Sequence, residues 1–286
     1  MTAQVQEAVG RTPDFLVIGA QKSGTSSIAN ALREAPGFFI SARKELHYFQ
    51  HFDPTADTAS WSRYQREFAG APAGVLAGEA TPNYLPKRVV PARIRSVAPN
   101  VRLIASLRNP VDRAYSAYWH AIRFGVVKKS LTFAQFIERE ARDFGDGWTT
   151  AVGDGCYSTQ LQCYYQHFDR EQLLVVLFDD LIRDPGSTMT RVIRHINPAS
   201  DVEFTWKFPH SNPAHLRFAP RLARRILNPR GKPARPLPGL RRMLMRERQA
   251  MPPIEPHVRA MLTDLYRPWN RELESMIERP LAGWGT

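Results

Sequence analysis

The sequence predicts an α/β fold in which a parallel sheet carries helices on both faces. Short apolar runs that suit buried strands alternate with segments of helical periodicity along the chain. A glycine-bounded turn follows the first apolar run and leads into a helix-like segment. In sheets of this class, ligands bind beyond the carboxyl ends of the strands. We therefore expect the functional residues in the loops that follow the predicted strands.

The first unit of this pattern is a strand, a loop and a helix. Residues 15–18 are apolar, residues 19–24 form a turn that begins and ends with glycine, and residues 28–33 suit a helix. The unpaired N–H groups and the positive dipole at the start of such a helix bind phosphate or sulfate. A nucleotide-triphosphate loop has a lysine directly after its second glycine. Here a threonine follows Gly24 and the lysine, Lys22, precedes it, so the loop departs from that pattern.

The next predicted strand begins at Phe38 and runs into a polar loop. That loop contains Glu45 and His47 after a basic pair, Arg43 and Lys44. A spacing of two places Glu45 and His47 on the same side of an extended segment. The residues alone leave Glu45 as either a functional carboxylate or the partner of a neighbouring cation. They leave His47 as either a substrate contact or a structural histidine.

A second anion-binding helix start is predicted further along the chain. Residues 101–108 suit a strand that ends in Arg108. Asn109 suits a helix N-cap and Pro110 suits the first helical position. Arginine presents a planar fork of donors that matches phosphate oxygens. Arg108 is therefore a candidate phosphate ligand.

The remaining elements continue the alternation. Thr132 and Gln135 form a capping box that opens a helix through about residue 142. Cys156 and Cys163 are expected to be free thiols. The other expected elements are a helix over residues 58–68, a strand from residue 75 that leads into a loop with Glu79, a helix over 156–168, a strand over 173–181, and helices over 188–196 and 254–278.

The whole chain of 286 residues fits one domain with a basic appendage. We expect a flexible leader over residues 1–13 and a single domain over 14–286. Its net charge of +12 is concentrated in residues 217–248, which contain eleven Arg or Lys residues and one acid. Proline is frequent there, and we expect a basic lid or insertion over about residues 210–252. No run of apolar residues reaches membrane-spanning length, and we expect a cytoplasmic protein.

Three segments together resemble the sulfotransferases that use 3'-phosphoadenosine 5'-phosphosulfate (PAPS), in particular the Golgi heparan sulfate sulfotransferases and their bacterial relatives. Residues 22–27, Lys-Ser-Gly-Thr-Ser-Ser, resemble the phosphosulfate loop of that family. Residues 107–118, Leu-Arg-Asn-Pro-Val-Asp-Arg-Ala-Tyr-Ser-Ala-Tyr, resemble its 3'-phosphate motif. Residues 79–84, Glu-Ala-Thr-Pro-Asn-Tyr, are similar to its Glu-Lys-Thr-Pro-x-Tyr segment, but Ala80 replaces the family lysine. The likeness extends from residue 14 to residue 284.

The resemblance implies a sulfotransferase fold and a role for each candidate residue. It implies that Glu45 is the general base and that Lys22 stabilises the leaving phosphate. His47 would assist in catalysis or contact the acceptor, and Glu79 would contact the acceptor. The residues that it implies for donor binding are Lys22, Ser23, Gly24, Thr25, Ser26, Ser27, Arg108, Ser116 and Arg217. No metal is expected. The acceptor would be a glycan, a lipid or a small molecule, with an anionic or membrane-associated acceptor suggested by the basic stretch; whether oxygen or nitrogen is sulfated, and the oligomeric state, stay open.

Two other classes of function are weighed against this one. A P-loop kinase would hold magnesium through the carboxylates of residues 179–180, but the loop lysine lies at the wrong position for it. A non-catalytic protein that binds nucleic acid or acidic membranes would use the basic stretch, yet it would not need two ordered anion loops. No nucleic-acid partner is therefore expected. Metal dependence and the choice between ATP and PAPS separate the two enzymes.

Overall fold

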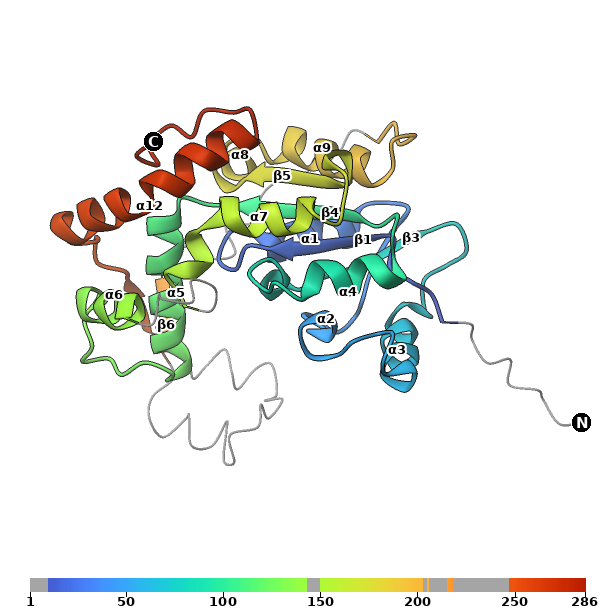
Figure 1. Ribbon diagram of the computed structural model, residues 1–286, viewed down its shortest axis with the longest axis horizontal. Helices are drawn as coiled ribbons and strands as arrows, with labels where there is room; N and C mark the ends of the chain where they lie inside the picture. Colours follow the sequence, from blue (N-terminus) through green and yellow to red (C-terminus); the bar gives the residue numbers. More distant parts are fainter. Residues whose placement is uncertain (1–9, 143–149, 203–204, 206–214, 219–246) are drawn as a thin grey trace, which may run out of the picture.

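A five-stranded parallel sheet forms the centre of the protein (Figure 1). The computed structural model describes residues 10–142, 150–202, 205, 215–218 and 247–286. The strands follow the order β2-β3-β1-β4-β5, so that β1, which precedes the first anion loop, lies in the middle of the sheet. Their bounds are β1 (Phe15–Gly19), β2 (Phe38–Ile40), β3 (Leu76–Ala80), β4 (Arg102–Leu107) and β5 (Leu173–Leu177).

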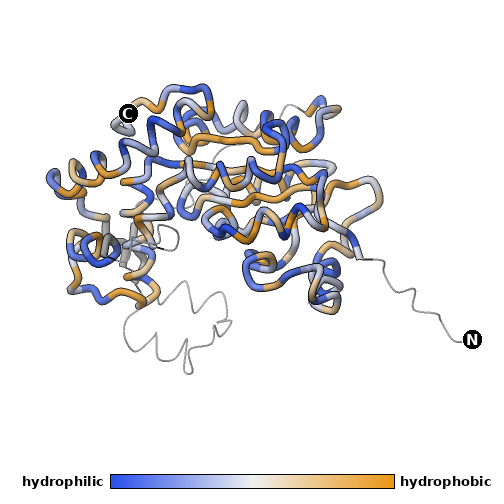
Figure 2. Tube along the Cα trace, viewed as in Figure 1, coloured by the Kyte–Doolittle hydropathy of each residue, from blue (hydrophilic) through white to orange (hydrophobic). Residues whose placement is uncertain are grey.

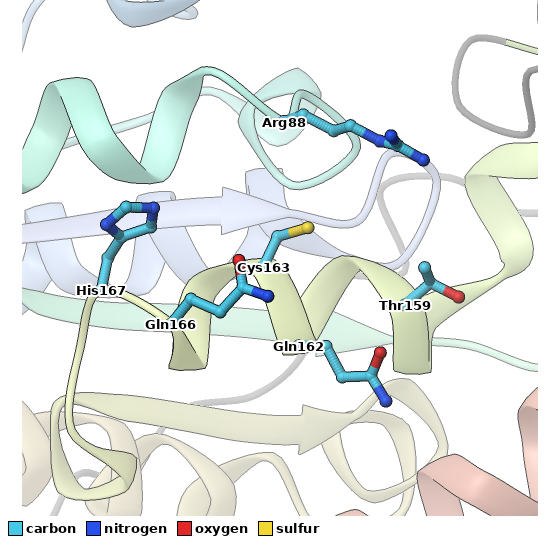
Figure 3. Close-up of a pocket in the computed structure, with 6 residues that line it drawn as sticks. All are labelled: Arg88, Thr159, Gln162, Cys163, Gln166 and His167. Atoms are coloured by element: carbon cyan, nitrogen blue, oxygen red, sulfur yellow. The ribbon is translucent and has the colours of Figure 1, made fainter.

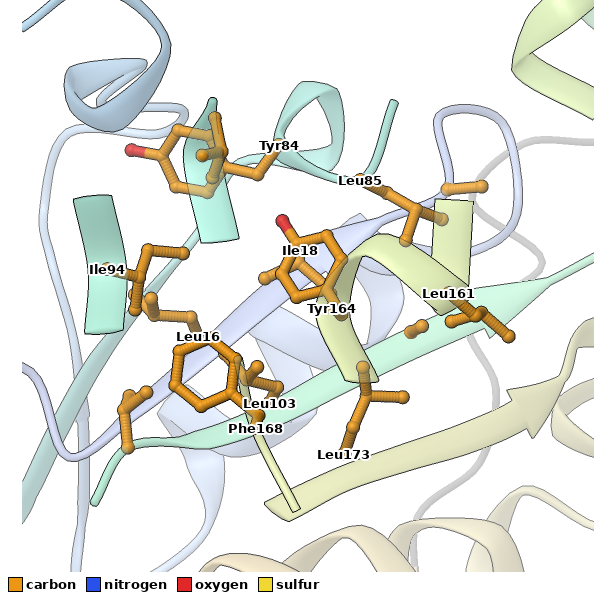
Figure 4. Packing of buried hydrophobic residues seen from close by; sticks show 14 of the residues in the cluster. Leu16, Ile18, Tyr84, Leu85, Ile94, Leu103, Leu161, Tyr164, Phe168 and Leu173 are labelled. Atoms are coloured by element: carbon orange, nitrogen blue, oxygen red, sulfur yellow. The ribbon is translucent and has the colours of Figure 1, made fainter. Parts of the chain in front are cut away.

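Helices cover both faces of the sheet, as the alternation predicts. Side chains of β1 point alternately to the two faces, with Leu16 and Ile18 in one apolar cluster and Phe15 and Val17 in the other. The first cluster includes residues of α4 (Val90–Val97) and α7 (Tyr157–Tyr165), and the second includes residues of α1 (Thr25–Glu34) and α9 (Pro185–Ile196). Figure 2 shows the hydrophobic residues concentrated along the strands, and Figure 4 shows the packing of the first cluster.

A third apolar cluster joins the long helices beyond the sheet edge. It contains residues of α5 (Pro110–Phe124), α6 (Phe133–Arg142) and α12 (Pro256–Met276). The backbone N–H of Gln135 donates to Thr132 Oγ1 at 3.2 Å, and Thr132 N–H donates to Gln135 Oε1 at 3.0 Å, which confirms the predicted capping box of α6. The cluster packs α5 against α6 and α12. Because α5 begins at Pro110, directly after β4 ends at Leu107, its N-terminus lies at the carboxyl edge of the sheet.

The predicted strand over residues 173–181 is too long. β5 ends at Leu177, and α8 (Phe178–Arg183) begins at once. Asp179 and Asp180 lie in the first turn of α8, where carboxylates interact favourably with the positive helix end. The apolar run therefore continues into a helix start, and Phe178 packs both against the apolar cluster that contains α1 and against the first loop at Gly24.

The remaining short elements are α2 (Tyr48–His51), α3 (Thr58–Gln65) and an antiparallel pair formed by β6 (His215–Phe218) and β7 (Glu247–Ala250). The backbone of Arg217 lies in β6, but its side chain and most of the basic stretch lie outside the described residues, as does the expected leader up to residue 9. Among the described residues, no helix combines the length and the apolar character needed to cross a bilayer.

Candidate functional site at the carboxyl ends of the strands

The first anion loop connects β1 to α1 and has the backbone that its glycine requires. Gly24 is the N-cap of α1 with φ of 85°, a left-handed conformation. A Cβ atom at Gly24 would lie 2.8 Å from the ring of Phe178. Lys22 is also left-handed, with φ of 71°. The side chains of Ser23 and Thr25 are buried, whereas those of Ser26 and Ser27 are half-buried. The backbone N–H of Ser23 donates to the carbonyl oxygen of Ala20 at 3.3 Å.

The charge of Lys22 is destabilised by its surroundings. Its pKa is lowered to about 8, first by burial and then by the positive charges of Arg123, Arg108 and Lys44, while the carboxylate of Glu45 acts in the opposite direction. Two other predicted site residues, Arg108 and Glu45, therefore both lie near Lys22. Lys22 and the three cations that act on it outnumber the one carboxylate that does, Glu45, and this excess of positive charge favours a bound anion.

Arg108 follows β4 and is held over the first loop. Its Nη1 donates to the carbonyl oxygen of Lys22 at 3.5 Å, and its guanidinium lies 5.0 Å from the centroid of the Phe178 ring. Burial lowers the pKa of Arg108. Asn109 caps α5 by accepting from Val111 N–H at 3.0 Å, as predicted, and Tyr157 donates to the carbonyl oxygen of Arg108 at 2.9 Å. Ser116 lies further along α5 and is half-buried.

The Glu45 segment is not extended, contrary to the prediction. Glu45 has φ of 58° and His47 has φ of 56°, so both residues are left-handed. Their side chains nevertheless meet, with His47 Nε2 lying 3.4 Å from Glu45 Oε2. Of the two neighbouring cations, Lys44 Nζ lies 3.6 Å from Glu45 Oε1, whereas Arg43 pairs with Glu67 at 3.6 Å. Two tight left-handed turns, rather than a pleated strand, bring the carboxylate and the imidazole together.

Glu79 lies inside the protein and not on the open site. It is completely buried, and its carboxylate accepts from Tyr64 at 3.0 Å, from Tyr84 at 2.7 Å and from Thr81 at 2.6 Å. The backbone N–H of Leu46 also approaches it at 3.4 Å. Burial raises the pKa of Glu79, and these hydrogen bonds oppose the shift. This placement favours a structural role for Glu79 over the acceptor contact that the resemblance implies, because Glu79 anchors the residue that follows Glu45.

His120 of α5 belongs to the same region, although the sequence reading did not select it. Burial, together with the charges of Lys22, Arg123 and Lys44, lowers the pKa of His120 to about 4. Ser116, His120 and Arg123 recur at the spacing of one helical face. That spacing, starting from the predicted Ser116, was the sequence signal that would have found His120.

Asp180, one of the two carboxylates considered for magnesium in a kinase, is engaged in ion pairs. Asp180 accepts from Arg279 Nη2 at 2.7 Å and also pairs with Arg183. The hydrogen bond from Arg279 holds the pKa of Asp180 below its usual value. Within the part of the chain that the structure describes, no group of three or more His, Cys, Asp or Glu residues is placed to hold a metal ion.

Two cavities open on the surface near these elements. One, of about 370 Å³, lies along α7 (Figure 3); its lining, which includes Arg88 and Cys163, contains none of the predicted site residues. The other, of about 510 Å³, adjoins the Glu45 segment through Arg43 and Leu46. Besides these two residues it is lined by Tyr48, Phe52, Ser60, Arg63, Tyr64, Arg66 and Glu67.

Sulfotransferases are among the known proteins that this chain resembles. Residues 12–204 match the family model described as a sulfotransferase domain. The chain is 26% identical over 287 residues to heparan sulfate glucosamine 3-O-sulfotransferase 3A1 of Mus musculus, covering 98% of this chain and 66% of that protein. It is 27% identical to the bifunctional heparan sulfate N-deacetylase/N-sulfotransferase 2 of Homo sapiens, covering 98% of this chain and 31% of that protein.

The fold is shared with a solved sulfotransferase from Alicyclobacillus acidocaldarius. The TM-score is 0.71 with 24% sequence identity, over 96% of this chain and 100% of that chain. The shared region contains the parallel sheet and its flanking helices. With more than half of its residues matched by the family model, the chain belongs to the sulfotransferase family.

Proposed function

We propose that this protein transfers the sulfuryl group of PAPS to a hydroxyl or amine group of an anionic glycan. The observation that carries the proposal is the convergence on Lys22, whose charge interacts with both Arg108 and Glu45. A phosphate-binding arginine, a loop lysine and a carboxylate thereby surround one point at the start of α1. Such an arrangement suits a reaction in which negative charge develops on a leaving phosphate.

The residues present fit a donor with two separate phosphate groups. The N-terminus of α1 supplies backbone N–H groups for the phosphosulfate, and Gly24 leaves room for close approach. Arg108 lies beside the N-terminus of α5, where its planar fork suits the 3'-phosphate. Burial of Lys22 and Arg108 strengthens their interaction with a bound anion, because the surroundings screen the charges less than water does.

The proposed reaction is an in-line transfer in which each side chain has one task. PAPS supplies an activated sulfuryl group joined to phosphate through a bridging oxygen. Glu45 accepts the proton of the acceptor as the new bond to sulfur forms, while His47, at 3.4 Å, orients the carboxylate. Lys22 balances the charge that the bridging oxygen gains as its bond to sulfur breaks.

The choice of an anionic acceptor rests on the cavity beside Glu45. Arg43, Arg63 and Arg66 all line it, and Glu67 is the single acid among its lining residues. Of its aromatic residues, Phe52 is exposed, whereas Tyr48 and Tyr64 are buried and stack on each other. Arginine forks match carboxylate and sulfate groups. The relatives named above have heparan sulfate in their names, which is consistent with this class of acceptor.

The direct test is turnover with PAPS. We expect mass spectrometry to detect transfer of one sulfuryl group to desulfated heparan oligosaccharides or to another uronic-acid glycan in a panel that also contains neutral glycans, lipids and phenols. Glu45→Gln keeps the shape of the side chain and should abolish transfer while leaving the affinity for 3'-phosphoadenosine 5'-phosphate nearly unchanged. Glu138→Gln, at an exposed position of α6, is the matched control. A fully active Glu45→Gln enzyme would reject Glu45 as the base.

The acceptor cavity has its own test. The double variant Arg63→Ala/Arg66→Ala should raise the acceptor KM by about tenfold, on the scale of one or two weakened charged contacts, and leave donor affinity unchanged. Arg191→Ala/Arg194→Ala, on the outer side of α9, is the matched control for the loss of two exposed charges. An equal rise of KM in both double variants would mean that net charge, and not this cavity, attracts the acceptor.

A further inference from the structure

Lys44 links the donor loop to the proposed base. Its ammonium donates to Ser26 Oγ at 2.6 Å, in the first turn of α1, and lies 3.6 Å from Glu45 Oε1. The side chain is 57% exposed, so the ammonium reaches across the surface between two parts of the site and is not buried against either. A cation in this place lies between the α1 N-terminus, where an anion binds, and the carboxylate that would receive a proton.

Residue 80 contributes no cation from the neighbouring strand. Ala80 is 5% exposed and packs in the apolar cluster that contains Ile28 and Ala29 of α1. The strand β3 therefore ends beneath α1 with a methyl group. Lys44 reaches the same helix from the β2 side instead, and its charge acts on Lys22.

On the basis of the proposed function, we propose that Lys44 is a second catalytic cation, which binds the non-bridging oxygens of the sulfuryl group during transfer. Lys22 and Lys44 then have different partners. Lys22 acts on the bridging oxygen of the departing phosphate, and Lys44 acts on the group that moves. When a donor is bound, the ammonium of Lys44 exchanges Ser26 Oγ for a sulfuryl oxygen, a charged partner that gives a stronger hydrogen bond.

The step is balanced without any change in the charge of Lys44. The acceptor oxygen or nitrogen forms a bond to sulfur, and the sulfur bond to the bridging oxygen breaks with its electron pair retained by the phosphate. The acceptor proton moves to Glu45. Lys44 remains an ammonium throughout, and until the proton is transferred its attraction to Glu45 holds the carboxylate beside the reacting group.

The test separates transfer from donor binding. Lys44→Ala should lower kcat by about a hundredfold, the scale for loss of one stabiliser of transition-state charge. Its Kd for 3'-phosphoadenosine 5'-phosphate, which lacks the sulfuryl group, should change less than twofold, because the contact that is lost belongs to that group. Lys128→Ala removes an exposed lysine beyond the end of α5 and is the matched control.

Chemical rescue tests the charge itself. Lys44→Cys should be as slow as Lys44→Ala, and alkylation with 2-bromoethylamine, which restores an ammonium at nearly the same reach, should recover at least tenfold in kcat. The parent protein treated in the same way controls for Cys156 and Cys163. An unchanged kcat in Lys44→Ala, or a loss of bisphosphate affinity equal to the loss of kcat, would overturn the assignment. If the parent itself transfers nothing from PAPS, the proposed function fails instead.

Discussion

The pH dependence of turnover should report the protonation of Lys22. Its pKa is lowered to about 8, chiefly by burial. The free enzyme therefore has about nine-tenths of Lys22 charged at pH 7 and about one-tenth at pH 9. Since only the ammonium can balance charge on the leaving phosphate, kcat/KM for the donor should be full below pH 7 and fall about tenfold per pH unit above pH 8. A bound anion favours the charged form, so the fall in kcat should begin at higher pH.

The assay is a pH series of initial rates at fixed ionic strength, for the parent and for two variants. Lys22→Arg keeps a charge that does not titrate in this range and should remove the alkaline fall. Lys22→Ala should lose about a hundred- to a thousandfold in kcat and also lose the alkaline fall. If the fall persists unchanged in Lys22→Arg, another group causes it and the assignment of Lys22 is refuted.

Three further predictions test the positions of the loop, the phosphate ligand and the buried carboxylate. Gly24→Ala should lower the free energy of unfolding more than Gly37→Ala does, and it should also weaken donor binding. Both glycines have positive φ, but only Gly24 faces the Phe178 ring. Equal losses of stability in a denaturant titration would exclude the steric effect. Arg108→Lys should weaken binding of 3'-phosphoadenosine 5'-phosphate by about 1–3 kcal/mol in calorimetry and hardly change binding of adenosine 5'-phosphosulfate; equal losses would mean that Arg108 does not bind the 3'-phosphate. Glu79→Gln should lower the free energy of unfolding by about 1–3 kcal/mol, because a hydroxyl that now donates to the carboxylate loses its partner, and a fully stable but inactive variant would return Glu79 to the acceptor site.

The sheet and its first loop were predictable because local signals agree there with the tertiary packing. The apolar run over β1 is buried on both faces, and Gly24, Asn109 and Thr132 lie where helix starts were expected. The end of β5 was not predictable from hydrophobicity. Phe178 continues the apolar run, yet it leaves the sheet because its ring packs against Gly24 and Arg108.

The site residues differ in how far their positions depend on segments that are distant in the sequence. Lys22 and Arg108 follow strands, and their places are set by the adjoining helix starts. Glu45 and His47 were expected on a pleated segment, but the backbone turns there because Leu46 between them is drawn toward the buried Glu79, in another strand. A contact between residues so far apart in sequence leaves no local pattern.

The ring of Phe178 contacts two parts of the proposed donor site, Gly24 and Arg108. One edge of the ring limits how close α1 can come, through Gly24, and its face supports the guanidinium of Arg108. One uncharged side chain therefore contacts both the loop that precedes α1 and the arginine that follows β4. Under the proposed function, a smaller side chain at residue 178 would loosen the position of Arg108 relative to the first loop. Discrimination between a bisphosphorylated nucleotide and ATP would then depend in part on a residue that itself carries no charge.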